Sequence, residues 1–539
     1  MSAGLGKVPA EQTYLDVGQG NRVFGSLYKE PLPVLDGDRR KWWREVVERA
    51  ESAPAEIVPR LLGSTLAKAH VDDFEDRGAS LAELGRIVEQ ADDEQLLIAI
   101  ERPSGESDAP LAIGIAGDGF DGNLTSDSTR MDGYVLSTDV APTILDHAGL
   151  AIPSQMSGQP IRSEGSVDVA AIESLGDRMG VISHRRGPVI GLSLLAWIAA
   201  LGLAIALSKG ALTRPAVRVT GLAIVYMPLV LLGAAAIEPA QTAEVLLVML
   251  GAPLLGALTL ALLPGYRALA AAAALTVCAY GIDLVAGSPL TSLSLLGPNP
   301  GLGVRFYGIG NELEALLAVL VVAGTGAGLA GFLPGIERRR AAAAFVAIGL
   351  LAAFLFAAGR FGADVGAAIV FPVGAVVAAV AIAGRGRRIG LLAVVAAPFA
   401  MLALLALIDL VSGANAHLTR SVLDAGGLGD LSDVAQRRLQ LSAHSFARPV
   451  LLAFLPVVAI LAGLAYVRRD RLRAWVSAVP AVRAGLLGAL AATIVGTLAN
   501  DSGALLLEIG TAYLLVFTGF AWAESLRTPV SSKDLDTPD

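Results

Sequence analysis

The sequence predicts a membrane protein in two parts: an extracytoplasmic α/β domain over residues 1–183 and an all-α polytopic bundle of about eleven transmembrane helices over residues 184–525. A cytoplasmic tail over 526–539 follows. Apolar residues make up 54% of the 539 residues and charged residues 17%, against about 25% in an average soluble chain. Residues 1–183 carry 31 acidic and 16 basic residues, a net charge of −15, whereas residues 184–539 carry 18 and 25, a net charge of +7. These observations exclude a wholly soluble enzyme and a disordered chain.

The first part alternates two kinds of pattern. Amphipathic spacing and capping residues predict helices, and short apolar runs predict buried strands. Helices that alternate with buried strands indicate an α/β layered domain. The expected helices are 38–51, 80–91 and 138–150, and the expected strands are 94–100 and 110–117.

Residues 95–162, which include STDVAPTILDHAGL (137–150), resemble the C-terminal part of the alkaline-phosphatase/sulfatase superfamily. The resemblance implies a partial phosphatase-like fold. In that superfamily an Asp-His metal motif follows the strand that corresponds to 94–100, but this chain continues with ERPS (101–104). Residues 1–40 also offer no apolar strand that ends in Asp, as the nucleophile site requires. Two-metal phosphoryl transfer needs several converging ligands, so we expect a pseudoenzyme in this domain.

Residues 1–30 contain no basic segment followed by an apolar stretch, which a secretory signal requires. An acidic domain of this size nevertheless has to cross the membrane. We therefore expect the native protein to begin upstream of Met1, with a signal segment and the rest of the phosphatase-like domain.

The second part contains long uncharged apolar stretches, which predict membrane-spanning helices. Their ends are punctuated by Gly, Pro or Arg. The expected spans are 188–207, 219–237, 245–263, 268–286, 308–332, 341–358, 363–384, 389–411, 448–467, 484–500 and 504–523.

The loops between these spans predict an orientation. If the loop after the first span is cytoplasmic, the cytoplasmic segments hold 17 Lys and Arg residues and the outer segments hold 8. Basic residues concentrate on the cytoplasmic side, so the first domain lies outside the cell membrane and the C-terminus inside. Arg185 and Arg186, just before the first span, run against this bias.

Polar residues within or beside the spans fall at the predicted outer ends. A charge inside the bilayer is costly and usually faces a wet cavity or a partner. The alternative is that helix ends near the lipid headgroups simply tolerate polar residues. The residues are Asp283, Asn311, Glu312, Glu314, Arg360, Asp364, Asp409, Asn500, Asp501 and Glu508.

Three outer stretches stand out. Residues 297–316 form a Gly/Pro-rich loop that enters a helix, either as an anion-binding helix start or as a small-residue packing seam. Glu312 and Glu314 point to nearly opposite sides of that helix, and we expect Glu312 to face the cavity. In GRFGADVGAA (359–368) the arginine and the aspartate are four residues apart and could pair. ANDSGALLLEIG (499–510) is either a tight hairpin or a half-membrane kink.

The predicted outer loop 412–447 is the longest link between spans, and its second half has helical spacing. It carries His417, which is either catalytic or merely structural, and Arg420. Arginine suits bidentate binding of phosphate, and a carboxylate or histidine can act as a general base. The catalytic candidates are Glu312, Asp364, His417 and Asp501. The substrate-binding candidates are Arg305, Tyr307, Asn311, Arg360, Arg420, Asn500 and Glu508.

The whole chain resembles bacterial envelope proteins that join such an ectodomain to a polytopic membrane part. The motifs that carry this resemblance are RFYGIGNE (305–312), HLTR (417–420) and NDSG (500–503). Three functions remain open: a transferase or ligase for a lipid-linked glycan or phosphate, a transporter or flippase for a similar substrate, and a non-catalytic envelope scaffold. Acids on the outer side alone favour the first, because transport is expected to need a pathway across the membrane.

The sequence predicts membrane lipids as partners and leaves the oligomeric state open. The acidic first domain argues against a nucleic-acid partner, because phosphate backbones require a basic face. A single cysteine allows no intrachain disulfide, and the five scattered histidines show no zinc-ligand spacing. We expect no metal and no cofactor.

Overall fold

The computed structural model describes residues 1–412 apart from 35, 36, 54, 72, 73, 93, 104, 106–108, 385 and 386, then 442, 445, 446, 456, 459, 460, 463–471, 474 and 478–526. The chain divides into two compact units. Unit 1 comprises Met1–Ser183 and Pro298–Tyr307, and unit 2 comprises His184–Gly297 and Gly308–Asp539. The segment Pro298–Tyr307, which the sequence places in the membrane part, thus belongs to unit 1.

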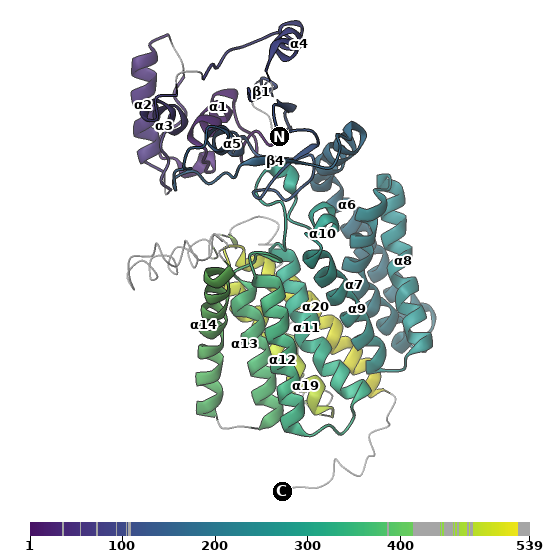
Figure 1. The fold of residues 1–539 in the computed structure, drawn as a ribbon. Coiled ribbons are helices and arrows are strands. Elements are labelled where there is room, and N and C mark those ends of the chain that lie inside the picture. Colours follow the sequence, from purple (N-terminus) through teal and green to yellow (C-terminus); the bar gives the residue numbers. More distant parts are fainter. Residues whose placement is uncertain are drawn as a thin grey trace, which may run out of the picture. The chain divides into compact units, whose positions relative to one another are not determined.

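Short helices make up much of unit 1, and local capping explains where several of them begin and end (Figure 1). The carboxylate of Asp38 accepts hydrogen bonds from the backbone N–H groups of Arg40 and Lys41, which starts α2. Ser80 and Glu83 form a capping box at the start of α4. The helices are α1 (Ala10–Gln19), α2 (Arg39–Glu51), α3 (Leu61–Lys68), α4 (Leu81–Gln90) and α5 (Val140–His147).

The strands of unit 1 form two antiparallel pairs among the described residues. β1 (Leu97–Ile100) pairs with β2 (Ile113–Ala116), and β3 (Asn123–Ser126) pairs with β4 (Ile161–Glu164). The first pair lies within the two expected strand regions. Two-stranded pairs are not a layered sheet, so the α/β architecture and the phosphatase-like fold stay predictions.

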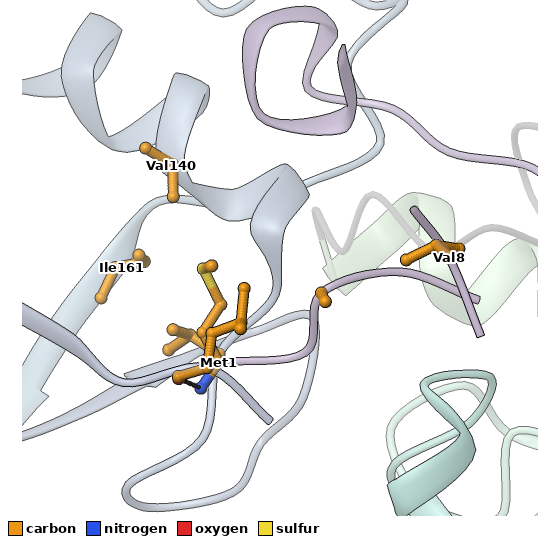
Figure 2. Packing of buried hydrophobic residues seen from close by; sticks show 7 residues of the cluster. Met1, Val8, Val140 and Ile161 are labelled. Carbon is orange, nitrogen blue, oxygen red and sulfur yellow. Dashed lines mark hydrogen bonds between the residues drawn. The ribbon is translucent and has the colours of Figure 1, made fainter. Parts of the chain in front are cut away.

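Two apolar clusters form the core of unit 1. Figure 2 shows residues of the first, in which Met1, Val8, Val140 and Ile161 come from distant parts of the chain. The second joins Leu62 and Leu66 of α3 to Ala141 and Leu145 of α5 and to Met156. Helix α5 carries residues of both clusters on its two faces, so it connects the halves of this core.

Unit 2 is a helical bundle, and the sequence prediction of a multi-pass membrane protein is confirmed at this level. Among the described residues, nine helices are long and apolar enough to span a membrane. They are α6 (Val169–Leu207), α7 (Thr213–Ile237), α8 (Gln241–Leu262), α9 (Tyr266–Val285), α11 (Asn311–Phe332), α12 (Arg338–Ala357), α14 (Arg387–Ser412), α19 (Pro480–Ala499) and α20 (Gly503–Ser525).

The other two expected spans stand differently. The stretch predicted at 363–384 contains α13 (Ala367–Ala383), an apolar helix of 17 residues that is shorter than the nine. The stretch predicted at 448–467 lies largely outside the described residues. The orientation of the bundle stays a prediction.

Small residues let the central helices of unit 2 approach closely. Helices α11, α13 and α19 contact one another and run side by side in Figure 1. A Cβ on Gly488 of α19 would overlap the carbonyl oxygen of Gly374 in α13. A Cβ on Gly326 of α11 would lie 2.6 Å from the carbonyl oxygen of Ala481. Such contacts are typical of membrane helices, where close backbone packing contributes most of the association.

Candidate functional site in the membrane unit

The start of α11 is fixed by a close backbone contact with the connection between α12 and α13. The N–H of Ile309 donates to the carbonyl oxygen of Gly362 at 2.9 Å. Gly308 has φ of 77°, and a Cβ there would overlap the same carbonyl oxygen. Only glycine fits this position, because it needs both a left-handed backbone and no side chain.

Glu314 lies one turn into α11 and its side chain is wholly buried. The side-chain amide of Asn500 donates to its Oε2 at 2.7 Å. Asn500 belongs to the three-residue connection between α19 and α20, which therefore forms the tight hairpin of the two alternatives. A buried carboxylate at a membrane-helix end is costly, and such residues are usually functional.

The same connection makes a second contact with α11. The side-chain amide of Asn311 donates to Oδ1 of Asp501 at 3.1 Å. Asp501 is exposed, whereas its neighbour Asn500 is buried. The α19–α20 turn is therefore attached twice to the first turn of α11, and it presents one carboxylate to solvent.

Asp364 and Glu314 flank the backbone of Gly366. The N–H of Gly366 donates to Oδ1 of the buried Asp364 at 2.8 Å. A Cβ on Gly366 would lie 2.7 Å from either carboxylate oxygen of Glu314. Arg360 is exposed in the same connection, and its predicted pairing with Asp364 stays a prediction.

Glu312 forms an ion pair with Arg186 of α6. Nη1 of Arg186 lies 3.0 Å from Oε1 of Glu312, and Nη2 donates to the carbonyl oxygen of Gly297 at 2.8 Å. About a quarter of each side chain is exposed, 27% for the arginine and 25% for the glutamate. Arg186, the exception to the charge bias, thus has a specific acidic partner.

We call the residues Asn311, Glu312, Glu314, Asp364, Asn500 and Asp501 the acidic end of unit 2. The sequence expectation named all of these except Glu314 as site residues. Helix α11 is apolar on nearly every side, with 72% of its most apolar window buried, so hydropathy could not distinguish the face of Glu314 from that of Glu312.

The remaining predicted residues lie elsewhere. Glu508 is half-buried in α20. Arg305 and Tyr307 belong to unit 1, where the guanidinium of Arg130 stacks 3.9 Å from the centre of the Tyr307 ring. His417 and Arg420 lie outside the described residues, as does most of the loop 412–447, including its second half with helical spacing.

The far end of α20 carries a separate ion-paired group. Nε of Arg218 lies 2.9 Å from Oε1 of Glu524, and Nη2 of Arg214 lies 3.5 Å from the same oxygen. A helix of 23 residues spans about 35 Å, so this group is remote from the acidic end. It fastens α7 to α20.

In unit 1, several polar residues within 123–164 form hydrogen bonds and an ion pair with one another. Asp127 pairs with Arg162 at 2.6 Å, and the hydroxyl of Ser128 donates to Oδ1 of Asp139 at 2.6 Å. Burial raises the pKa of Asp139, whose carboxylate also accepts hydrogen bonds from Ser126, Leu136 N and Gln159 N. This network stabilises the start of α5.

Within the described part of the chain, no group of three or more His, Cys, Asp or Glu side chains is placed to hold a metal ion. The chemical groups available at the acidic end are carboxylates and side-chain amides, together with the guanidinium of Arg186 that pairs with Glu312. They can accept a proton, hold a turn in place and bind an anion. Comparisons with protein-family models, with curated proteins and with solved structures give no match to this chain.

Proposed function

We propose that this multi-pass membrane protein is a transferase or ligase of the bacterial cell envelope. It acts on a lipid-linked glycan or phosphate at the extracytoplasmic face of the cell membrane. The observation that carries the proposal is the double attachment of the α19–α20 turn to α11, through Glu314–Asn500 and Asn311–Asp501. A buried carboxylate that holds an asparagine beside an exposed aspartate is an arrangement for positioning that aspartate.

In this mechanism Asp501 is the general base. It is exposed, so a hydroxyl acceptor can reach it, and the amide of Asn311 orients its carboxylate. Asp501 takes the proton from the acceptor hydroxyl as that oxygen attacks the activated carbon or phosphorus of the lipid-linked donor. Attack at carbon breaks the bond to the lipid phosphate, and attack at phosphorus breaks the bond to the oxygen on the lipid side. In either case the departing oxygen leaves with the bonding electron pair.

Glu314 acts through Asn500 and is a positioning residue. Its side chain is closed to solvent, so it contacts the turn rather than the substrate. The ectodomain takes no part in this chemistry. The departures of its sequence from the phosphatase pattern support a binding or structural role for it.

The proposal is tested by lipid analysis of the native host. Chromosomal D501N and E314Q variants are compared with a deletion strain, and lipid-linked glycans and phosphates are quantified by mass spectrometry. Loss of a general base lowers the rate by about 10²–10⁴-fold, so D501N should accumulate the same lipid-linked species as the deletion strain. E314Q should accumulate it to a smaller extent.

Glu337 provides the matched control. It lies before α12, is 63% exposed and pairs only loosely with Arg340 at 3.8 Å. E337Q should leave the lipid profile at the wild-type level. A deletion strain with a wild-type profile would overturn the proposal. An unchanged pool whose glycans become inaccessible to a membrane-impermeant oxidant would instead identify a flippase.

A further inference from the structure

One N–H donor of the Arg186 guanidinium has no acceptor among the described residues. Its two Nη atoms contact Glu312 and the carbonyl oxygen of Gly297, while its buried Nε has no hydrogen-bond partner among the described residues. Buried hydrogen-bond donors in proteins nearly always have an acceptor, so an unpaired buried N–H group calls for an explanation. A guanidinium offers five N–H groups in a planar fork that matches the oxygens of a phosphate.

The neighbouring Arg185 provides a comparison, because its ion pair with Glu244 is more deeply buried. Nη1 of Arg185 donates to the carbonyl oxygen of Pro239 at 2.7 Å and lies 3.3 Å from Oε2 of Glu244. The side chain of Glu244 is wholly buried. Its counter-ion cannot leave without exposing a buried charge, so this pair is structural.

The pair of Arg186 and Glu312 differs in this respect. Glu312 is 25% exposed and lies in the first turn of α11, so its carboxylate can turn into solvent. A partly exposed ion pair contributes little net free energy, and a second anion of higher charge can therefore displace the carboxylate. Glu312, whose carboxylate the anion would replace, lies in the same helical turn as Asn311. The side-chain amide of Asn311 donates a hydrogen bond to Asp501.

We propose that Arg186 is the substrate's phosphate-binding residue and that Glu312 is its displaceable counter-ion. The ligand is a phosphate group that carries more than one negative charge, either as a phosphomonoester on a lipid or as free phosphate. Binding exchanges one anion for another on Arg186 and releases Glu312 into solvent. This inference rests on the function proposed above, to which it adds the group that the site recognises.

The test uses the purified full-length protein in dodecyl maltoside, a detergent without phosphate. Thermal unfolding is followed against the concentration of farnesyl phosphate, inorganic phosphate or the neutral farnesol, because a ligand that binds the folded state raises the midpoint. Farnesyl phosphate should stabilise the wild type and farnesol should not. Equal stabilisation by inorganic phosphate would identify free phosphate as the ligand, and an effect of farnesyl phosphate alone would identify a lipid headgroup.

The two partners of the ion pair should respond in opposite directions. R186Q should weaken phosphate binding by about ten- to a hundredfold, as expected for loss of a charged hydrogen bond. E312Q should tighten it by about two- to fivefold, because the competing carboxylate is gone. R186K keeps the charge without the fork and should also bind more weakly, which covers the case in which R186Q does not fold.

R340Q is the matched control, because Arg340 also forms an ion pair with a glutamate, while its side chain is 81% exposed and its loss leaves no buried charge. Its phosphate binding should equal that of the wild type. The proposal is overturned if E312Q weakens binding or leaves it unchanged, if R340Q loses as much as R186Q, or if neither phosphate binds the wild type. If neither phosphate stabilises the protein but D501N still accumulates the lipid-linked species, only this inference is wrong. If phosphate binds as expected but the deletion strain has the lipid profile of the wild type, only the proposed function is wrong.

Discussion

The side-chain amide of Asn500 donates a hydrogen bond to the wholly buried carboxylate of Glu314 at 2.7 Å. The two residues are 186 positions apart. Their contact fixes the turn between α19 and α20 against the first turn of α11. A second, exposed amide–carboxylate pair, Asn311 with Asp501, joins the same two elements. The two pairs share chemistry and differ in burial, which makes their contributions separable.

N500A should destabilise unit 2 by about 1–3 kcal/mol, because it removes an amide donor from a buried carboxylate. N311A should cost less than about 1 kcal/mol, because water replaces the lost donor at an exposed site. Thermal unfolding of the purified full-length variants measures both. Equal losses in the two variants would show that burial of Glu314 does not govern the strength of its contact.

The glycine contacts between central helices give a second prediction. G488V should destabilise the bundle by about 1–3 kcal/mol, because its side chain would meet the backbone of Gly374 in α13. Gly233 of α7 has open space around it, so G233A should be neutral or gain up to about 1 kcal/mol from helix propensity. Unfolding in increasing dodecyl sulfate measures the difference. Comparable losses would mean that the α13–α19 contact is loose.

The sequence predicts the membrane part well because apolar length is a local property. Nine of the expected spans correspond to long apolar helices in the described part of the chain. The face that a helix buries is not local when the helix is apolar all round. Glu312 and Glu314 are two residues apart on α11, and the tertiary neighbours Asn500 and Gly366 lie against Glu314, which is the enclosed one.

The pairing of site residues depends on tertiary structure in the same way. The sequence suggested that Asn311, Asn500 and Asp501 share one site, because all three fall at the same expected membrane face. The specific pairs, and the partnership of Arg186 with Glu312, follow from the approach of helices far apart in the chain. The exception to the charge rule at Arg186 was the signal that could have indicated an acidic partner.

Unit 1 should show a pH-dependent stability that originates at Asp16. Burial raises the pKa of this carboxyl to about 7 from an ordinary value of 3.8, although Gln12, Gln19, Arg22 and Arg49 favour its charged form. Between these values the folded state holds a proton that the unfolded state has released. The contribution of Asp16 to stability is therefore largest below about pH 4, falls as the pH rises to about 7, and then stays constant.

D16N should remove this pH dependence, because the amide oxygen still accepts hydrogen bonds and carries no charge. Hydrogen exchange of α1 in the full-length protein, corrected for intrinsic rates at pH 5 and pH 8, measures it. The wild type should be better protected at pH 5, and D16N should lose most of that difference. Asp139, whose pKa burial also raises, is present in both proteins and cancels in the comparison. The same pH response in both proteins would contradict the assignment to Asp16.

The charge distribution of the loops predicts which end of unit 2 faces the outside, and cysteine labelling tests it. Cys278 is first replaced by alanine, because its side chain is exposed. Single cysteines are then placed at Ala286, an exposed position directly after α9, and at Ala211, an exposed position between α6 and α7. Helix α9 ends on the side of unit 2 where α11 begins, and the α6–α7 connection lies on the opposite side.

On intact cells a membrane-impermeant thiol reagent should modify A286C and leave A211C untouched until the membrane is permeabilised, because Lys and Arg concentrate in cytoplasmic segments. Labelling of A211C alone would place the acidic end in the cytoplasm, and the substrate of Asp501 would then have to be a cytoplasmic one.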